Sequence, residues 1–413
     1  MSYTPVVIIG AGQAGLAMSH CLSRNGIDHI VLERGRIAER WHSERWDSLR
    51  LLTPNWMSRL PGWSYAGNDP DGFMSAAAFA DYLQAYARAS QAPIRINTIV
   101  MAVRRGALGF QVETNHGTWH ARAVVIATGH CDVPAIPAMA SDLSRSIAQV
   151  TPSDYRNPGQ LPPGGVLVVG ASATGVQLAA ELRQSGRPVT LAAGRHTRLP
   201  RRYRGQDIWY WLEQTGILDE TTLSVRDLDR ARNQPSFQLV GRPNGGTIDL
   251  STLQADGVRL AGRLIGIAGT RVTLRDDLPA TVEEAQVALE RLLDRLDAFA
   301  DARGAPAAKP EARRPIAVQP GPTSIELEAS GIRTVLWANG FSRNYAWLKL
   351  PVLDAAGEIV HDGGVTPEPG LYALGLRFQR RRRSNFIDGV GLDAEDLAAA
   401  VSQHLAPPGC AAA

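Results

Sequence analysis

The strongest constraint on the fold is a glycine pattern that follows the first strand-like stretch of the chain. The run VVIIG-AGQAG places Gly10, Gly12 and Gly15 at the G-x-G-x-x-G spacing directly after apolar, β-branched residues. The first glycine allows a tight turn, the second lets the backbone approach a pyrophosphate, and the third lets helix and strand pack closely. The positive end of the following helix also favours phosphate. The stretch therefore predicts a dinucleotide-binding βαβ unit.

An acidic residue at the end of the next strand indicates which nucleotide this unit binds. The stretch HIVLE ends at Glu33, eighteen residues after Gly15. A carboxylate at this position accepts hydrogen bonds from an adenosine ribose, and it repels the 2′-phosphate that distinguishes NADPH from NADH. We therefore expect FAD or NAD in the first unit.

The same pattern recurs about 160 residues later. In the stretch GGVLVVGASATGVQLA, residues 164–179, the outer glycines recur as Gly170 and Gly175, and Ser172 stands at the middle glycine position. A serine hydroxyl can donate a hydrogen bond to a phosphate oxygen, so we expect a second nucleotide site. The stretch does not match the hydrolase motif G-x-S-x-G, because Thr174 stands where that motif requires glycine.

The second unit lacks the acidic ribose ligand. The position that corresponds to Glu33 is Ala193, and Arg195 and Arg198 follow it. Guanidinium groups suit a 2′-phosphate, whereas a carboxylate repels it. We therefore expect NADPH in this unit, and other loop arginines could replace these two: Arg201, Arg202 and Arg204.

Composition excludes several other classes of protein. The 413 residues exceed the size of a typical domain, and the net charge of +3 is too small to suggest a nucleic-acid partner. No apolar run reaches the ~18 residues that a membrane helix needs. The N-terminus carries no signal-peptide pattern, so we expect a cytoplasmic protein without a membrane partner.

Cysteine and histidine spacing argues against a metal site or a redox-active dithiol. Cys21, Cys131 and Cys410 are far apart and form no C-x-x-C pair. His20, His130 and Cys131 have no partners at the spacing of metal ligands, so we expect no metal.

Local patterns predict a few further elements. Apolar periodicity predicts helices over 75–90 and 281–300, and the text of 304–315 is typical of a loop. We expect the run Arg380–Arg383 in a solvated loop. Asp393 is placed to cap the last helix of the chain.

The two glycine fingerprints, a strand ending in ATG after the first and a strand ending in WANG after the second resemble the two-dinucleotide-binding-domain flavoproteins. In that superfamily the NADPH domain is inserted into the FAD domain, which the C-terminal segment completes. The resemblance implies an α/β fold with two Rossmann-like domains. We expect a discontinuous FAD domain over 1–155 and 330–413, and an NADPH domain over 156–329 with a helical segment near 281–300.

Within that superfamily the sequence looks more like the class B flavin-dependent monooxygenases, because RWDSLRLLTP followed by LPG, and ATGHCDVPAIP, resemble segments that lie along their flavin. The disulfide reductases of the superfamily need paired cysteines. The fingerprint F-x-G-x-x-x-H-x-x-x-[YFW], aligned on Tyr155, keeps only its aromatic residue, which weakens a Baeyer-Villiger assignment most.

The resemblance implies that NADPH reduces FAD and that O₂ then forms a C4a-(hydro)peroxyflavin, which transfers one oxygen atom to a small organic substrate. N or S oxygenation, hydroxylation and Baeyer-Villiger insertion stay open. The alternatives are an NADPH-dependent flavin reductase or dehydrogenase without oxygen insertion, and a nucleotide-binding sensor without turnover. The oligomeric state is also open, with a homodimer as one option.

The resemblance also suggests site residues. Asn55 is the candidate catalytic residue, holding NADP⁺ or the oxygenated flavin by an amide hydrogen bond, and its alternative role is to cap a turn after Pro54. Arg50 is expected at the flavin pyrophosphate or in solvent, and the last helix is expected to aim its N-terminus at the flavin. The expected FAD ligands are Gly10, Gly12, Gln13, Ala14, Gly15, Glu33, Arg34, Trp41, Arg50, Thr53, Thr128, Gly129 and Asp388. The expected NADPH ligands are Gly170, Ser172, Ala173, Thr174, Gly175, Arg195 and Arg198.

Overall fold

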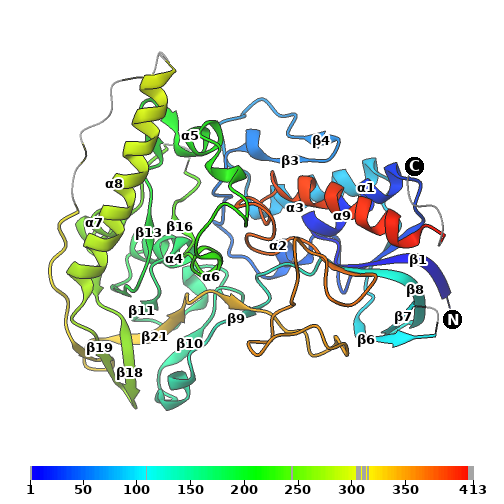
Figure 1. Cartoon of the computed structure of the whole chain (residues 1–413). Helices are drawn as coiled ribbons and strands as arrows, with labels where there is room; N and C mark the ends of the chain where they lie inside the picture. The colour runs from blue at the N-terminus through cyan, green and yellow to red at the C-terminus, as the bar shows by residue number, and fades with distance from the viewer. Residues whose placement is uncertain are drawn as a thin grey trace.

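The chain folds into two α/β units, each built around its own sheet (Figure 1). The computed structural model describes residues 2–107, 109–242, 245–303, 308, 313 and 316–407. Cys410 and nearly all of the loop expected over 304–315 lie outside these described residues.

The first sheet has seven strands in the order β5-β2-β1-β8-β7-β6, with β23 also paired to β8. β1 runs parallel to β2 and β8, whereas β6, β7 and β8 form an antiparallel meander. Its strands are β1 (Ser2–Ile9), β2 (His29–Leu32), β5 (Ile94–Arg95), β6 (Val100–Gly106), β7 (Gly109–Thr114), β8 (Gly117–Ile126) and β23 (Leu371–Ala373).

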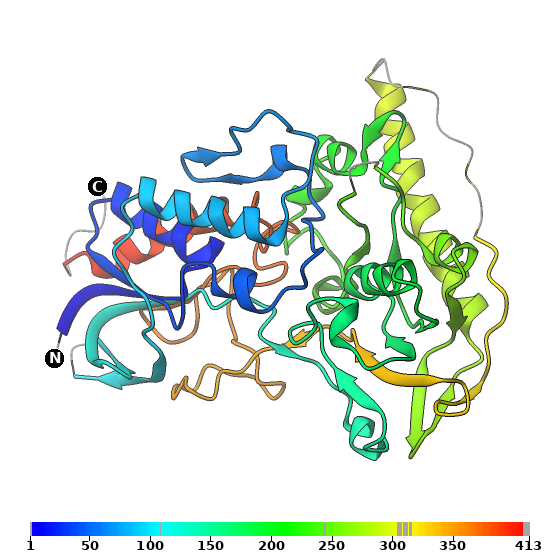
Figure 2. The same cartoon turned by 180° about the vertical axis from the view of Figure 1, so that it is seen from behind.

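Side chains alternate between the two faces of this sheet, and each face has its own core. On one face Val6, Ile8 and Val125 pack against three helices: α1 (Gln13–Arg24), α3 (Ala76–Ala89) and α9 (Val390–Leu405). Figures 1 and 2 show these helices side by side over the sheet. The opposite face packs against the meander and the segment 345–359.

The second sheet is fully parallel, in the order β10-β21-β11-β12-β17. Such a sheet needs cover on both faces. One face packs on helices α4, α7 and the start of α8, and the other on the small antiparallel sheet β18-β19-β20. These elements are β10 (Ala148–Val150), β11 (Gly165–Val169), β12 (Val189–Ala192), β17 (Arg259–Ala261), β18 (Leu264–Ala268), β19 (Arg271–Leu274), β20 (Ser324–Glu326), β21 (Ile332–Trp337), α4 (Ala173–Gln184), α7 (Leu250–Ala255) and α8 (Leu278–Ala302).

Both helices predicted from periodicity are confirmed. α3 begins after Ser75, whose hydroxyl accepts a hydrogen bond from the N–H of Ala78 at 3.1 Å. α8 buries the apolar stripe that contains Val282, Leu289 and Leu296.

The strand pairing corrects the expected domain boundaries. The segment from 330 was assigned to the FAD domain, but β21 pairs in parallel with β11 and β10 in the second sheet. The second unit therefore runs from β10 to β21, because a strand belongs to the sheet whose backbone groups it satisfies. The C-terminal segment does complete the first unit, as expected: β23 pairs with β8, and α9 packs on α1.

The two chain passages between the units lie next to each other. β9 (Val133–Pro134) leaves the first unit and pairs antiparallel with β22 (Phe341–Ser342), which returns to it. The second unit is thus inserted through one narrow two-stranded ribbon.

The remaining short elements connect these helices and strands. They are α2 (Glu39–Ser43), η1 (Asn55–Met57), β3 (Arg59–Leu60), β4 (Trp63–Ser64), η2 (Ala138–Asp142), η3 (Pro158–Gln160), β13 (Thr197–Arg198), β14 (Arg202–Tyr203), β15 (Gln206–Asp207), α5 (Ile208–Gln214), η4 (Ile217–Asp219), α6 (Leu228–Arg232) and β16 (Phe237–Gln238). In the described part of the chain, no helix is both long and apolar enough to pass through a bilayer.

Candidate functional site

A cavity of about 1010 Å³ extends from the first glycine turn to the walls of the second unit. Its volume is at the upper end of the roughly 300–1,000 Å³ that is usual for small-molecule sites. Eleven of the residues predicted from the sequence line it: Gly10, Gly12, Gln13, Ala14, Glu33, Arg34, Trp41, Thr53, Thr128, Gly129 and Arg198.

The first glycine turn is shaped to receive a phosphate. Gly10 has a φ of +107°, and a Cβ on Gly15 would lie 1.8 Å from the carbonyl oxygen of Gly10, so neither position accepts a side chain. A Cβ on Gly12 would meet nothing within 4 Å. Gly12 also caps α1 without any side-chain hydrogen bond, which leaves the first N–H groups of the helix free for a ligand. The turn therefore fits a dinucleotide pyrophosphate.

Glu33 has the position expected of a ribose ligand and also holds the turn in place. Its side chain is buried at the end of β2, where Oε2 accepts a hydrogen bond from the N–H of Ala11 at 2.7 Å and Oε1 one from the N–H of Gly35 at 3.0 Å. Each carboxylate oxygen can accept a second hydrogen bond. Glu33 can thus bind a ribose hydroxyl without releasing the glycine turn.

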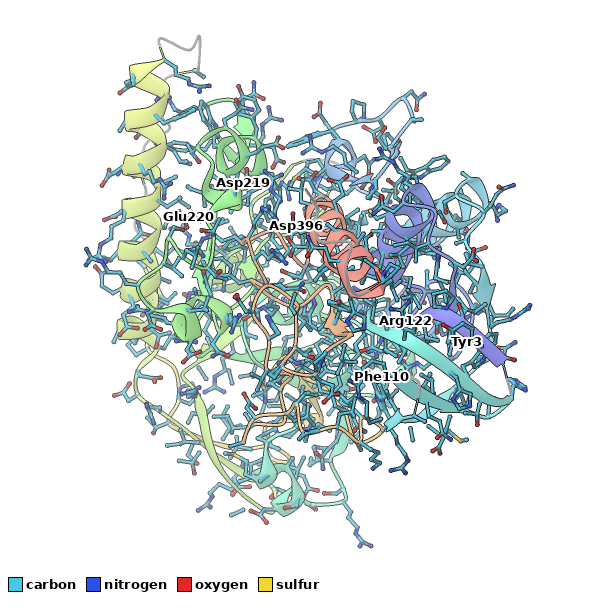
Figure 3. The ribbon with its side chains drawn as sticks, turned by 45° about the vertical axis from the view of Figure 1, so that its right-hand side comes forward. Tyr3, Phe110, Arg122, Asp219, Glu220 and Asp396 are labelled. Carbon is cyan, nitrogen blue, oxygen red and sulfur yellow. The ribbon has the colours of Figure 1, made fainter. Side chains whose placement is uncertain are left out.

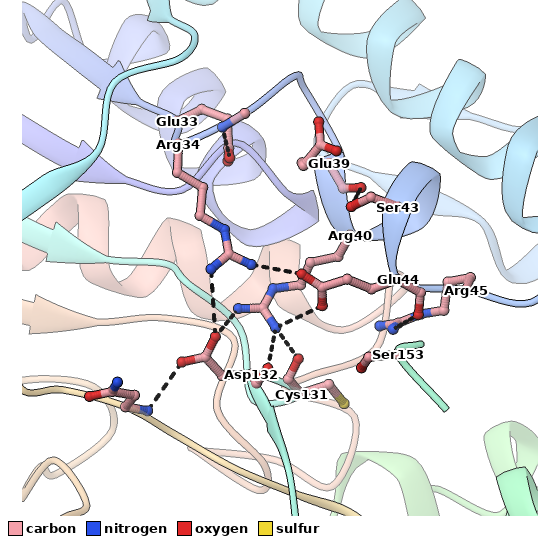
Figure 4. A network of polar contacts seen from close by, with 12 residues as sticks. Glu33, Arg34, Glu39, Arg40, Ser43, Glu44, Arg45, Cys131, Asp132 and Ser153 are labelled. Carbon is pink, nitrogen blue, oxygen red and sulfur yellow. Dashed lines mark hydrogen bonds and ion pairs between the residues drawn. The ribbon is translucent and has the colours of Figure 1, made fainter. Parts of the chain in front are cut away.

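A network of charges lies along the cavity wall near Glu33 (Figure 4). Arg34 pairs with Glu44 at 2.8 Å, and Arg40 pairs with both Glu44 and Asp132. Arg34 was predicted from the sequence, whereas Arg40, Glu44 and Asp132 were not. The guanidinium charges of Arg34 and Arg40 are thereby balanced by Glu44 and Asp132.

Arg45 and Cys131 also line the cavity and were not predicted as ligands. The Arg45 guanidinium lies 5.3 Å from the centre of the Trp41 ring and donates to the carbonyl oxygen of Glu44. Burial lowers the pKa of Arg45. Burial alone would raise the pKa of the Cys131 thiol, but His130 and the guanidinium groups of Arg45 and Arg40 lower it to about 7.

Arg50, by contrast, does not reach the cavity. Its side chain is exposed and donates to the carbonyl oxygen of Phe73 at 2.8 Å. The expectation of a pyrophosphate contact at Arg50 is thus wrong in this geometry, and Arg45 is the arginine of this segment that faces the site.

The Asn55 side chain also makes hydrogen bonds within the protein. Its amide nitrogen donates to the carbonyl oxygen of Asp69 at 2.9 Å, and its Oδ1 accepts from the N–H of Met74 at 2.8 Å. The side chain is buried and does not line the cavity. The Asn55 side chain therefore fastens the segment 69–74 to the turn after Pro54, and its predicted contact with NADP⁺ or the flavin stays a prediction.

Asp388 likewise points away from the cavity. Its Oδ1 lies 2.5 Å from Arg59 Nε, and its Oδ2 lies 2.7 Å from Arg383 Nη1. Two guanidinium groups thus neutralise its charge, and the FAD contact expected at Asp388 stays a prediction. The neighbouring residues Asn385 and Phe386 line the cavity instead.

The last helix begins earlier than expected. α9 starts at Val390 after Gly389, which makes no side-chain cap. Asp393 lies inside the first turn, fully buried, and pairs with Arg381 at 2.8 Å, so it is not the N-cap. The free N-terminus of α9 directly follows cavity residues, and its predicted role toward the flavin stays a prediction.

The second glycine turn repeats the geometry of the first. A Cβ on Gly175 would lie 1.8 Å from the carbonyl oxygen of Gly170, and Ser172 caps α4 without a side-chain hydrogen bond. Beside the turn, the fully buried Gln238 donates to the carbonyl oxygen of Ala171 at 2.7 Å, while its Oε1 has no hydrogen-bond partner within the described residues. A buried acceptor without a donor is costly, so this site fits a ligand that supplies one.

The two arginines predicted for the 2′-phosphate differ in their surroundings. Arg195 is exposed beyond β12 and donates to the carbonyl oxygen of Asn233. Arg198 is largely buried, pairs with Asp249 at 3.1 Å and donates to Gln286. Arg198 therefore stabilises the second unit, and Arg195 is the one available to a phosphate.

The other candidate arginines of this loop are engaged to different degrees. Arg201 is fully buried and pairs with Asp207, and Arg204 pairs with Asp301. Arg202 is exposed and donates only to the carbonyl oxygen of Gly205.

The run Arg380–Arg383 is not a solvated loop, which corrects the expectation from the sequence. These side chains form ion pairs: Arg380 and Arg381 with Asp396, Arg382 with Glu220, and Arg383 with Asp219. Figure 3 shows Asp219 and Glu220 between α8 and the helix that carries Asp396. The run therefore joins the C-terminal segment of the first unit to the second unit.

Comparison with known proteins identifies the family. The family described as pyridine nucleotide-disulphide oxidoreductase matches residues 7–215. A protein of Geobacillus kaustophilus described as an uncharacterized oxidoreductase, CzcO-like, is 34% identical over 97% of this chain and 98% of its own length. The rice indole-3-pyruvate monooxygenase YUCCA1 is 30% identical over 60% of this chain and 63% of its own length.

The solved structures show the same fold. A flavin-containing monooxygenase from Stenotrophomonas maltophilia matches with a TM-score of 0.69 over 98% of this chain and 100% of its own, at 19% identity. At that identity the likeness shows the fold alone, with its two nucleotide-binding units. The chain therefore belongs to the pyridine nucleotide-disulphide oxidoreductase family and is an oxidoreductase.

Proposed function

We propose that the protein is an FAD- and NADPH-dependent monooxygenase that transfers one oxygen atom from O₂ to a small organic substrate. The observation that carries the proposal is the cavity that both units line, from the first glycine turn to the second unit. Among the described residues, Cys131 is the only cysteine that lines it. A disulfide reductase would relay electrons through a second thiol beside the flavin. A cavity with one thiol favours oxygen transfer.

The first unit holds FAD in this proposal. The N–H groups at the start of α1 bind the pyrophosphate, and Glu33 binds the adenosine ribose. When bound, FAD supplies hydride acceptance and O₂ activation. Apolar side chains from both units, among them Trp209, Leu289 and Phe386, line the cavity and exclude water from the reacting atoms.

The second unit holds NADPH. The start of α4 and the Ser172 hydroxyl bind its pyrophosphate, Gln238 Oε1 accepts one of its donors, and Arg195 pairs with its 2′-phosphate. The absence of an acid at Ala193 removes the repulsion that Glu33 would exert on the 2′-phosphate.

Isotope labelling tests the proposal. The holoenzyme is supplied with NADPH, ¹⁸O₂ and a panel of amines, sulfides, ketones and aromatic acids, and the products are analysed by mass spectrometry. We expect one ¹⁸O atom in the product for each NADPH oxidised. NADPH oxidation balanced by H₂O₂, with no labelled product from any substrate, would instead show a reductase. A flavin that NADPH does not reduce would show a protein without turnover.

A further inference from the structure

Most arginines that line the cavity are already paired with an acid of the protein. The pairs are Arg34 and Arg40 with Glu44, Arg198 with Asp249, and Arg295 and Arg382 with Glu220. Within the described part of the chain, Arg45, Arg232 and Arg377 have no carboxylate oxygen within 4.0 Å. Arg45 lies beside Trp41 at the FAD end, so Arg232 and Arg377 are the two without an assigned anion.

Arg232 and Arg377 occupy the same corner of the cavity and come from different units. The Arg377 guanidinium, in the segment after β23, donates to the carbonyl oxygen of Gln234, and the Arg232 Nε, at the end of α6, lies 3.5 Å from the carbonyl oxygen of Phe378. These reciprocal contacts hold both groups where segments 232–237 and 377–386 face each other.

A buried guanidinium without a counter-charge is unfavourable. Burial lowers the pKa of Arg377, the Cys131 side chain raises it in part, and the nearby Arg343 lowers it. A backbone carbonyl solvates a guanidinium only in part, so a ligand anion that reached both groups would recover the lost charge stabilisation. A guanidinium group presents forked donors that match the geometry of a carboxylate, and both of these groups line the same cavity.

The same two segments also supply an aromatic surface. Phe237 and Phe386 both contact Trp209, at ring-centroid distances of 5.7 Å and 5.5 Å. All three rings line the cavity, together with Leu289 of α8. Both segments therefore contribute arginine and phenylalanine side chains to the cavity wall, which suits a ligand with a flat apolar body and one anionic end.

We propose that Arg232 and Arg377 form an oxyanion site that binds the carboxylate of an aromatic acid substrate, whose ring lies against Trp209, Phe237 and Phe386. The inference rests on the proposed function, because it takes this cavity as the substrate chamber. A phosphate oxygen of NADPH offers the same chemistry as a carboxylate, and the experiment separates the two ligands.

Calorimetric titration of the oxidised holoenzyme tests the site without requiring turnover, so its result can be read even if oxygen transfer fails. The probes are 3-phenylpropionate and its neutral isostere 3-phenylpropionamide. We expect the acid to bind at least about tenfold more tightly than the amide, as two charge-assisted hydrogen bonds predict. Arg377→Met should remove this difference and leave the affinity for NADP⁺ unchanged.

Two further variants provide a second test and a matched control. Arg232→Met should also reduce the preference for the acid, and it remains informative if Arg377→Met does not fold. Arg295→Met is the matched control, because its guanidinium lines the cavity but is already neutralised by Glu220. Equal binding of acid and amide to the unaltered protein would overturn the proposal. So would a loss of NADP⁺ affinity in Arg377→Met, which would assign the site to the coenzyme.

Discussion

Each glycine of the first turn performs a separate physical task, and the structure separates the tasks that the spacing predicted together. Gly15 is required by the fold, because any side chain there would collide with the backbone of Gly10. Gly12 is required only by the ligand, because the space above it is open. The G-x-G-x-x-G motif thus combines a packing requirement with a binding requirement.

This difference predicts opposite results for two alanine variants. Gly12→Ala should change the free energy of unfolding of the FAD-free protein by less than about 1 kcal/mol and weaken FAD binding about tenfold or more. Gly15→Ala should lower that free energy by about 3 kcal/mol or more, because the helix must move off the strand. Urea unfolding and flavin-fluorescence titration measure the two quantities. Equal destabilisation by both variants would contradict this assignment.

Cys131 should react as a thiolate near neutral pH. Its pKa of about 7 means that the alkylation rate rises as pH increases through about 7, whereas an ordinary thiol gains reactivity only at higher pH. Peptide-resolved mass spectrometry after iodoacetamide treatment measures the profile. Bound FAD should slow the reaction, because Cys131 lines the cavity.

Cys21 is the internal control for this measurement. Burial, together with Glu395, raises the pKa of its thiol to about 12, and the side chain lies in the core. It should stay unmodified over the same range of pH. An unprotected Cys131 in the FAD-saturated protein would show that the flavin does not occupy this part of the cavity.

Single residues of the site were only partly predictable from the sequence. Gly10, Gly12 and Glu33, which were predicted as cofactor ligands from motif spacing, line the cavity because that spacing fixes their place relative to the strand, and their contacts with a cofactor stay a prediction. Arg45 and Arg50 stand five residues apart in the same irregular segment, and no periodicity there indicates which one turns inward. Asn55 finds its partners Asp69 and Met74 only after the loop has folded.

At the scale of elements, the chain region after β12 combines a coenzyme-binding group with a stabilising one. Arg195 and Arg198 looked equivalent in the sequence because both follow the position of the missing acid. The capping residue of α7, Asp249, distinguishes them, because it is buried and needs the charge of Arg198. Helix capping thus decides which arginine remains free.

Substitution of Arg195 and of Arg198 should therefore affect different properties, coenzyme binding in one case and stability in the other. Arg195→Met should raise the KM for NADPH about tenfold without changing the KM for NADH, because only the 2′-phosphate contact is lost. Arg198→Met should lower the free energy of unfolding by about 3 kcal/mol or more, since Asp249 is left as an unpaired buried charge. Steady-state kinetics with both coenzymes and urea unfolding distinguish these effects. A loss of NADPH affinity in Arg198→Met and a loss of stability in Arg195→Met would contradict this assignment.

The bounds of helices with a strong apolar periodicity were predicted well. The sheet to which a strand belongs was not, because it depends on pairing with residues far away along the chain. α3 and α8 were expected within a few residues of their observed ends. The strand β21 was expected in its place along the chain but assigned to the first unit, because the superfamily analogy gave only an approximate boundary at residue 330. Similarity between the sequences of two strands does not determine in which sheet each strand pairs.

At the scale of the whole molecule, ion pairs join the two units. Arg383 contacts Asp388 in the first unit and Asp219 and Glu213 in the second, and its side chain is only 10% exposed. Arg59 of the first unit also pairs with Glu213. The sequence alone could not predict this, since a run of four arginines is more often solvated.

Removing this link should uncouple the units. Arg383→Met should leave Asp219 without its ion-pair partner, while Asp388 and Glu213 keep Arg59, and should lower the free energy of unfolding by about 2 kcal/mol. Differential scanning calorimetry should then resolve two transitions in place of one cooperative transition. Arg105→Met is the control, because the pair of Arg105 with Glu368 is surface-exposed and should contribute less than about 1 kcal/mol. A single unshifted transition in Arg383→Met would show that the units do not depend on this contact.

The insertion of one unit into the other also sets an order of events during synthesis on the ribosome. The strands of the second sheet lie in one continuous segment from β10 to β21, so that unit can fold while the rest of the chain is still being made. The first unit has to wait, because its strand β23 and helix α9 come from the end of the chain. Until then the face of α1 that meets α9 stays uncovered and open to chaperones or to wrong partners. Strand β23 and helix α9, which are translated after the whole second unit, thus complete a domain whose first strand was made before it.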